Sequence, residues 1–415
     1  MKVFALVDCN NFYASCERVF DPRLKRRAVV ILSNNDGCIV ARSNEAKALG
    51  IPMGVPFFEQ KALIKKHNVA VFSSNYQLYG DMSQRVMDSL RLHAPDMEVY
   101  SIDEAFLRLD YLQPRNLYEY CKMIRAKVLQ WTGIPVSIGI GPTKVLAKVA
   151  NRVAKKQTGI FDIRSRQVQD EILGTLTVDK IWGIARRWSE RLRMMGINKA
   201  SELRDASPAI IRRHLSVVGE RLLRELRGQS CIDLEETQAR KNIMSSKSFG
   251  NLLTRKGPIE EALANYAARA CEKLRKQNSQ AQGVHVFVQT NGFREIDKQY
   301  SNGFTCTLTT PTSDTRSIIE AAKFCLGRIY KQGYRYKKTG IMLLDLIPDS
   351  LEQKQLFVDC NPRDSLMDVV DRINQDHGPD TLFFGAQGVN REWKMRCGLR
   401  SPRYTTQWDE LLTVG

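Results

Sequence analysis

The residues with the clearest capacity for chemistry are two adjacent carboxylates, Asp103 and Glu104, in the strand-forming run Val99–Leu107. The apolar and β-branched neighbours on both sides favour a buried strand or hairpin. Neighbouring side chains on a regular strand point to opposite faces, so the two carboxylates can act together only where the backbone turns or bulges. Carboxylates held close together repel each other unless a cation neutralises them. The pair therefore predicts a divalent metal site, and a polar hairpin tip is the alternative.

A third carboxylate, Asp8, stands at the C-terminal end of the predicted strand Val3–Val7. The polar stretch that follows, Cys9–Cys16, predicts a turn into a short helix. A carboxylate at a strand end beside a loop is a common ligand position, whereas a strand-ending or helix-capping role is the alternative.

Basic residues with a regular spacing form a second group of candidates. On the helix predicted after Thr143, they lie on the face opposite an apolar stripe and therefore face either a polyanion or solvent. Lys47 and Arg42 lie in and beside a second predicted helix, Ser43–Gly50, where phosphate contact and a solvated basic face are both open. The residues of the basic row are Lys144, Lys148, Arg152 and Lys155.

The composition sets the context for these candidates. The chain has 415 residues, of which 43% are hydrophobic and 26% charged, and its formal net charge is +18. This positive charge favours a polyanionic partner, either nucleic acid or an acidic membrane surface. No apolar run approaches the length of a membrane span, so nucleic acid is the better candidate. Ten cysteines without a Cys-x-x-Cys pair and five histidines without ligand spacing predict reduced thiols in the cytoplasm and no zinc site. No P-loop is present, so a P-loop ATPase is not expected.

The expected elements place these residues in several domains. Further strands are expected at 28–32 and 134–140, with a helix at 81–92. The segment 177–197 predicts a helix, a glycine-centred hairpin and a second helix, which can present backbone N–H groups to a phosphate. A polar linker at 233–242 leads into a strand, helix, strand, strand, helix, strand order, the split βαββαβ layout. The chain after Pro348 is weakly patterned.

Six stretches spread over nearly the whole chain form a recognisable set. They are Asp8 and Asn10 with Phe12–Ser15, Leu32–Cys38, Glu45–Gly50, Phe72–Tyr76, Tyr100–Phe106 and Ser401–Thr406. With these motifs the sequence resembles the Y-family translesion DNA polymerases, and within them the UmuC type, the catalytic subunit of bacterial DNA polymerase V. The resemblance implies an error-prone, template-directed DNA polymerase of the SOS response to DNA damage.

The resemblance also implies an architecture. The fold would be α+β and multidomain, a right hand with palm, fingers, a small helical thumb, a βαββαβ little finger and a C-terminal extension. The palm would comprise residues 1–10 and 76–165, the fingers 11–75, the helix-hairpin-helix thumb 166–232 and the little finger 242–347. The extension, 348–415, would carry a clamp-binding peptide with Gln353, Leu356 and Phe357, in which Lys354 replaces the usual apolar second residue.

Roles for individual residues follow from the resemblance. Two Mg²⁺ ions would be held by Asp8, Asp103, Glu104 and the main-chain carbonyl of Cys9, and the three carboxylates would be catalytic. The nucleotide would contact Phe12, Tyr13, Lys47 and Lys155. Tyr13 would lie beneath the sugar and exclude a 2′-hydroxyl, and the two lysines would hold the triphosphate.

The expected partners are primer–template DNA, deoxynucleoside triphosphates and the sliding clamp, with two cleaved UmuD-type subunits and RecA implied by the resemblance alone. No membrane association is expected, and the location would be the cytoplasm, at the nucleoid. Two other functions remain open: a non-catalytic DNA-binding or scaffold protein of the same fold, and a two-metal nuclease.

Overall fold

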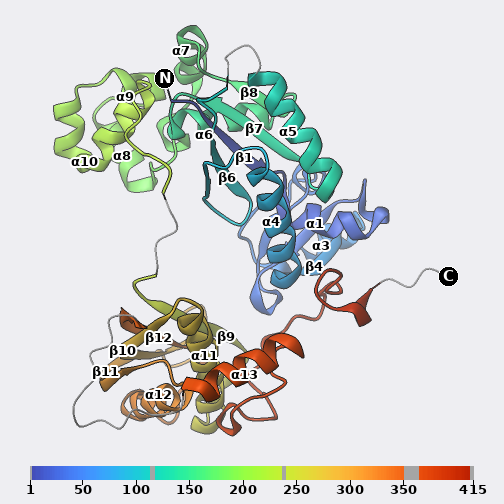
Figure 1. Ribbon diagram of the computed structural model, residues 1–415, viewed down its shortest axis with the longest axis vertical. Coiled ribbons are helices and arrows are strands. Elements are labelled where there is room, and N and C mark those ends of the chain that lie inside the picture. The colour runs from blue at the N-terminus through green and yellow to red at the C-terminus, as the bar shows by residue number, and fades with distance from the viewer. Residues whose placement is uncertain (1, 113–116, 236–239, 350–363, 412–415) are drawn as a thin grey trace. The chain divides into compact units, whose positions relative to one another are not determined.

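The computed structural model describes residues 2–112, 117–235, 240–349 and 364–411. Its internal contacts divide the chain into two compact units (Figure 1). The first unit comprises Met1–Ser33, Gly37–Thr237 and Leu399–Gly415, and the second comprises Asn34–Asp36 and Gln238–Gly398. Across the described ranges, no helix is long and apolar enough to cross a membrane.

A five-stranded sheet forms the centre of the first unit, in the order β5-β6-β1-β7-β8. Neighbouring strands are antiparallel except β7 and β8, which are parallel. All six residues of β1 are buried, as expected for a continuous apolar strand in the middle of a sheet with both faces covered. The strands are β1 (Phe4–Cys9), β5 (Met97–Val99), β6 (Glu104–Arg108), β7 (Val136–Gly141) and β8 (Ile160–Asp162).

Side chains that alternate along β1 divide between two cores. Ala5 and Val7 pack in a large cluster with residues of α4 (Tyr76–Arg91) and α5 (Leu117–Thr132). Phe4 and Leu6 face the other side, where they pack with Phe106 and with Ala147 of α6 (Lys144–Ala154). The period of two along the strand therefore places α6 directly behind the strand that carries Asp8.

A smaller sheet in the first unit has the order β3-β2-β4, with β2 antiparallel to β3 and parallel to β4. Its own apolar cluster includes Val30, Leu32, Ile39 and Ile51. The elements here are α1 (Phe12–Phe20), β2 (Val29–Leu32), β3 (Ile39–Arg42), α2 (Asn44–Ala48), α3 (Phe57–Lys66) and β4 (Ala70–Ser73).

Short helices follow β8 and pack around a third cluster, which they share with Val145, Leu146 and Val149 of α6. They are α7 (Arg166–Thr175), α8 (Arg186–Met194), α9 (Ala200–Asp205) and α10 (Pro208–Leu226). The expected first helix of the hairpin at 177–197 is wrong, since only a 3-10 turn forms at Val178–Lys180. The chain turns at Gly183, which has a φ of +89°, a conformation that glycine adopts without steric cost.

The second unit contains the predicted βαββαβ order as a four-stranded antiparallel sheet, β11-β10-β12-β9. Its two long helices pack against the sheet around one apolar cluster. The elements are β9 (Ile243–Leu253), α11 (Lys256–Lys276), β10 (Ser279–Thr290), β11 (Ser301–Thr312), α12 (Thr315–Ile329) and β12 (Tyr336–Pro348).

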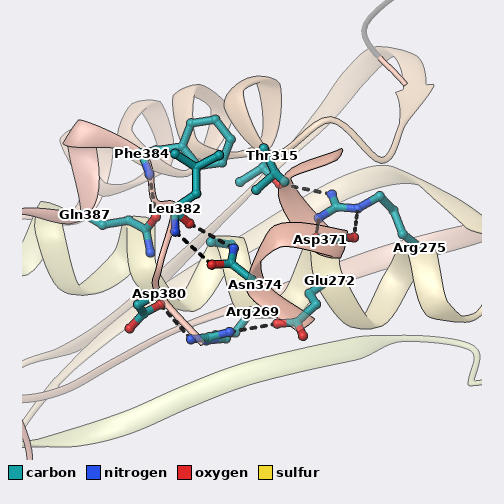
Figure 2. A pocket seen from close by; sticks show the side chains of 12 residues that line it. Arg269, Glu272, Arg275, Thr315, Asp371, Asn374, Asp380, Leu382, Phe384 and Gln387 are labelled. Carbon is teal, nitrogen blue, oxygen red and sulfur yellow. Dashed lines mark hydrogen bonds and ion pairs between the residues drawn. The ribbon is translucent and has the colours of Figure 1, made fainter. Parts of the chain in front are cut away.

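A helix that the sequence patterns did not predict, α13 (Asp364–Asp376), also belongs to the second unit. Arg275 of α11 forms a two-pronged ion pair with Asp371 of α13, with both N···O distances at 2.7 Å. Arg269 pairs with Asp380, just beyond α13, at 2.6 Å. Figure 2 shows these arginines in the pocket between α11, α13 and the loop that follows. Ion pairs from α11 therefore stabilise the packing of α13 in the second unit.

Candidate active site

The predicted carboxylates come together at one end of the five-stranded sheet. Asp8, on β1, stands directly opposite Glu104, on β6, in the antiparallel register. The backbone N–H of Cys9 donates to the carbonyl of Asp103 at 2.8 Å. Asp103 lies in the turn between the antiparallel strands β5 and β6. The structure therefore brings Asp8, Cys9, Asp103 and Glu104 together, and the backbone turns at the dipeptide as the alternation of side chains required.

Ser101 shapes this turn. Its hydroxyl donates to Asp103 Oδ1 at 2.7 Å and accepts the backbone N–H of Asp103 and of Glu104, at 3.3 and 3.1 Å. The hydroxyl of Ser83, on α4, donates to the carbonyl of Ile102 at 2.5 Å. These bonds hold Asp103 in the turn just before β6, so that its side chain and that of Glu104, the first residue of the strand, can serve one site.

The two carboxylates on β1 and β6 are electrostatically linked. Asp8 is 5% exposed, and burial raises its pKa to about 7 against the opposing charge of Lys155, with a further increase from its hydrogen bond to Glu104. Burial also disfavours ionised Glu104, but the bond with Asp8 and the ammonium group of Lys148 lower its pKa. The pKa of Asp8 is thus raised and that of Glu104 lowered, as expected for two carboxylates close together.

This donor set is suited to a hard divalent cation, which prefers carboxylate and carbonyl oxygens. Within the described residues, no three acidic, histidine or cysteine side chains are already grouped at metal-binding distance. Asp8 is held by Lys155, Glu104 by Lys148 and Asp103 by Ser101. The charge of a cation would replace the ammonium contacts of Asp8 and Glu104, and the backbone segments that carry the three carboxylates are already adjacent.

The basic row on α6 corrects an expectation. Lys144 is 1% exposed and pairs with Glu98 of β5, so it faces neither solvent nor a polyanion. Lys148 pairs with Glu104 at 2.9 Å, and its Nζ lies 4.2 Å from the centre of the Tyr100 ring. Lys155 pairs with Asp8 at 2.5 Å. Helical spacing identified a shared face but not its partner, which is the acidic end of the sheet.

A close contact between β7 and α6 holds these lysines in place. A Cβ atom added at Gly139 would lie 2.0 Å from the backbone nitrogen of Asn151 and 2.4 Å from the carbonyl oxygen of Ala147. The Asn151 side-chain amide donates to the carbonyls of Leu6 and Ser137, at 3.1 and 2.7 Å. The helix therefore sits directly on the sheet backbone.

Gly139→Ala is expected to lower the free energy of unfolding by about 3 kcal/mol, because backbone atoms must move apart to admit the methyl group. Urea unfolding measures the change. The control is Gly174→Ala in α7, where an added Cβ meets nothing within 4 Å. It is expected to leave stability unchanged or raise it by up to about 1 kcal/mol. Equal stabilities of Gly139→Ala and wild type would contradict the close β7–α6 contact.

Three of the four predicted nucleotide-contacting residues, Phe12, Tyr13 and Lys47, lie on α1 and α2. Phe12 is buried, and Tyr13 is half-buried with its ring stacked on Tyr79 at 4.4 Å between centres. Burial, then Tyr76 and then Asp103 raise the pKa of the Tyr13 hydroxyl, so this hydroxyl lies within electrostatic range of Asp103. Tyr79 was not among the predicted site residues, although its place in the first turns of α4 brings it against Tyr13.

Lys47, on α2, lies within electrostatic range of Asp8. Its ammonium group contacts the side-chain oxygens of Asn11 and Asn44. Desolvation, Arg42 and Lys155 lower its pKa, whereas Asp8 raises it. Lys155, paired with Asp8, and Lys47 are therefore close enough to influence each other, and two such cations are suited to an anion such as a triphosphate. The peptide with Gln353, Leu356 and Phe357 lies outside the described residues.

Known proteins are similar to this sequence over nearly its whole length. Residues 7–152 match the impB/mucB/samB family and residues 240–356 match the C-terminal domain of that family. Residues 364–414 match a domain of unknown function, DUF4113. Protein UmuC of Salmonella typhimurium is 46% identical over 421 aligned residues, covering 99% of this chain and 100% of that protein. Protein MucB of Escherichia coli is 39% identical, with 98% of each chain covered.

More distant relatives and solved structures with a similar fold include DNA polymerases. DNA polymerase IV 1 of Bacillus subtilis is 26% identical, with 95% of each chain covered. A chimera of the Y-family DNA polymerases Dbh and Dpo4 has a TM-score of 0.68 at 21% identity, covering 83% of this chain and 99% of that one. DinB from Sulfolobus solfataricus has a TM-score of 0.53 with the same coverage. The predicted α+β, multidomain polymerase fold is therefore confirmed, and the chain belongs to the impB/mucB/samB family of Y-family translesion DNA polymerases.

Proposed function

We propose that this chain is an error-prone, template-directed DNA polymerase that synthesises DNA across damaged template in the SOS response. The observation that carries the proposal is the meeting of Asp8 with Asp103 and Glu104, beside the cationic group of Lys47 and Lys155. Nucleotidyl transfer needs hard oxygen ligands at the reacting phosphate and cations along the triphosphate. Both kinds of group occur here within one site.

The cofactor implied by the family is a divalent metal, and we assign two Mg²⁺ ions to Asp8, Asp103, Glu104 and the carbonyl of Cys9. Bound there, the ions would make the primer 3′-hydroxyl more acidic and neutralise the charge that develops on the phosphates. The chain's own groups orient the nucleotide. Lys47 and Lys155 hold the triphosphate, and the Tyr13 ring, with Phe12 behind it, forms the floor under the sugar.

The same proposal assigns the domains of a right-hand polymerase architecture, with palm, fingers and thumb. The five-stranded sheet supports a palm at residues 1–10 and 76–165, and the small sheet supports fingers at 11–75. The helices α7–α10 support a thumb at 166–232, and the βαββαβ sheet supports a little finger at 242–347. Residues 348–415 would be the C-terminal extension.

Primer extension with Mg²⁺ tests the proposed activity against its two rivals. A polymerase lengthens the primer, a non-catalytic DNA-binding or scaffold homologue leaves it unchanged, and a two-metal nuclease shortens it. A template with a defined lesion, with and without the proposed partners, then tests translesion synthesis. Those partners are two cleaved UmuD-type subunits, RecA and the sliding clamp, and the proposed location is the cytoplasm, at the nucleoid.

The net charge of +18 leads to a prediction about DNA binding. Affinity for primer–template is expected to fall about a thousandfold between 50 and 200 mM salt, as for about six phosphate contacts that release counterions. Fluorescence anisotropy at several salt concentrations measures the slope. A flat response would mean that the excess charge does not lie against DNA.

The proposed clamp-binding peptide gives a second prediction. Replacing Leu356 and Phe357 together by alanine is expected to weaken clamp binding about a hundredfold, since paired apolar anchors supply most of the energy of such docking peptides. Surface plasmon resonance with immobilised clamp measures the affinity. Asp359→Ala, just beyond the motif, is the control with unchanged binding expected. Equal affinity of the double variant and the wild type would refute the docking role.

A further inference from the structure

The segment Leu399–Tyr404, here called the strap, belongs to the first unit and lies beside elements from the start of the chain, next to β4 (Figure 1). The strap pairs with the last residue of β4. The N–H of Ser73 donates to the carbonyl of Leu399, and the N–H of Leu399 donates to Ser73 Oγ, both at 3.0 Å. Arg400 forms a parallel bridge with Ser73. The strap is thus bonded through its backbone to the end of a strand more than 300 residues earlier.

Asn75 connects the strap to the start of α4. Its side-chain nitrogen lies 3.0 Å from both the carbonyl and the hydroxyl oxygen of Ser401 and 3.1 Å from the carbonyl of Pro402. The side-chain oxygen of Asn75 caps α4 by accepting from the N–H of Leu78. Asn75 and Ser401 are 1% and 5% exposed, so these bonds are shielded from water. The strap thereby fixes the first turn of α4.

Glu17 of α1 has a buried carboxyl group that connects Ser401 of the strap with Tyr79 of α4. Its Oε1 accepts from the hydroxyl of Ser401 at 3.0 Å and from the hydroxyl of Tyr79 at 2.6 Å. Glu17 is 2% exposed, and burial raises its pKa to about 7 against the effect of these two donors. A buried carboxyl group is costly unless its oxygens are bonded, so the two hydroxyl groups are held to the same atom.

The last link is the Tyr13 ring. Tyr79 lies fully buried beneath it, with ring centres 4.4 Å apart and planes 14° from parallel. Tyr13, Glu17 and Phe20 share one face of α1 because they are four and three residues apart. Phe20 stacks on Tyr404 of the strap at 4.7 Å and 11°. The strap therefore contacts the face of α1 that carries Tyr13 and reaches Tyr13 itself through Glu17 and Tyr79.

We propose that the strap is part of the apparatus that selects the sugar of the incoming nucleotide. Ser401, acting through Glu17 and Tyr79, positions the Tyr13 ring and so sets how strictly ribonucleotides are rejected, given the role under the sugar proposed above for Tyr13. Ser401, Glu17 and Tyr79 are positioning residues, because all three are buried and act on the nucleotide only through the Tyr13 ring. A strap that only stabilised the fold would affect deoxynucleotides and ribonucleotides equally.

The full-length chain, assayed by primer extension with Mg²⁺, tests this directly. The quantity measured is the ratio of kcat/KM for a deoxynucleotide to kcat/KM for the matching ribonucleotide. Ser401→Ala is expected to lower this ratio about tenfold, because the Ser401 hydroxyl group donates to the Glu17 carboxyl group and accepts from the Asn75 amide. The value of kcat/KM for the deoxynucleotide is expected to stay within about threefold of wild type. Ser401→Thr, which keeps the hydroxyl group, is expected to restore the ratio.

The matched control lies in the chain immediately after the strap. Thr405 has a buried hydroxyl without a hydrogen-bond partner among the described residues, so Thr405→Val removes a hydroxyl but no bond. It is expected to leave the ratio unchanged. Tyr79→Phe keeps the stacked ring and loses the bond to Glu17, and it provides a second variant if Ser401→Ala does not fold. The ratio of kcat/KM values for Tyr79→Phe is expected to fall about as much as for Ser401→Ala. Combining the two substitutions is expected to lower the ratio by less than the two separate free-energy effects added together.

The outcomes separate the strap from the role of Tyr13. If Tyr13→Ala destroys sugar selection while Ser401→Ala and Tyr79→Phe leave it unchanged, the strap does not position the ring. If Tyr13→Ala itself leaves sugar selection unchanged, the proposed role of Tyr13 is wrong and the strap has nothing to position. A lower ratio in both strap variants, restored by Ser401→Thr, supports the positioning role.

Discussion

Asp103→Ala is expected to reduce the rate of primer extension about a thousandfold or more, corresponding to about 4 kcal/mol of lost transition-state stabilisation. Asp103 supplies one of three carboxylates at the end of the sheet, and its backbone carbonyl already binds the N–H of Cys9. Alanine keeps this backbone contact and removes only the charged oxygens. The proposed metal site then loses one of its few hard ligands.

DNA binding is the measurement that separates lost chemistry from lost structure. Primer–template affinity of Asp103→Ala is expected to stay within about threefold of wild type, because the variant removes an acidic group and leaves every basic residue in place. Asp96→Ala is the control: it causes the same change of charge at an exposed position just before β5. It is expected to extend primers at the wild-type rate. Extension by Asp103→Ala at that rate would overturn the assignment of the carboxylates.

Tyr13→Ala is expected to lower the preference for deoxynucleotides over ribonucleotides about a hundredfold, or about 3 kcal/mol. The Tyr13 ring is held from below by Tyr79 and at its edge by Tyr76, with centres 6.2 Å apart and planes at 86°. A ring that cannot move aside excludes a 2′-hydroxyl by steric overlap, and alanine removes the obstacle. Extension by the two kinds of nucleotide on the same primer measures the preference.

Tyr13→Phe is the matched control for that experiment. It keeps the ring and its stacking on Tyr79, so the preference for deoxynucleotides is expected to remain within about threefold of wild type. If alanine and phenylalanine at this position give the same preference as tyrosine, the ring does not select the sugar.

The outline of the active site could be predicted from local sequence. Asp103 and Glu104 stand in a run of strand formers, and Asp8 ends the first strand, so strand periodicity alone placed these residues at strand ends or turns. The βαββαβ order of the second unit could be predicted for the same reason. Each of these elements has an apolar repeat that reports its own secondary structure, whatever it packs against.

The partners of charged residues could not be predicted in this way. The spacing of Lys144, Lys148 and Lys155 showed that they share a face of α6 but not that this face meets Glu98, Glu104 and Asp8. Helix periodicity is a property of one segment, whereas an ion pair depends on two segments. The close approach allowed by Gly139 decides which residues those lysines meet.

The sequence by itself determined the family, the carboxylates and the aromatic residue proposed to select the sugar, since each is contained in a short motif. Only the tertiary structure decided how that aromatic residue is supported. Ser401 bonds Glu17 across 384 residues of sequence, and neither residue has a local pattern that points to the other. Contacts of this kind arise when separately formed elements pack together, so they are specified by the fold as a whole and by no single stretch of the chain.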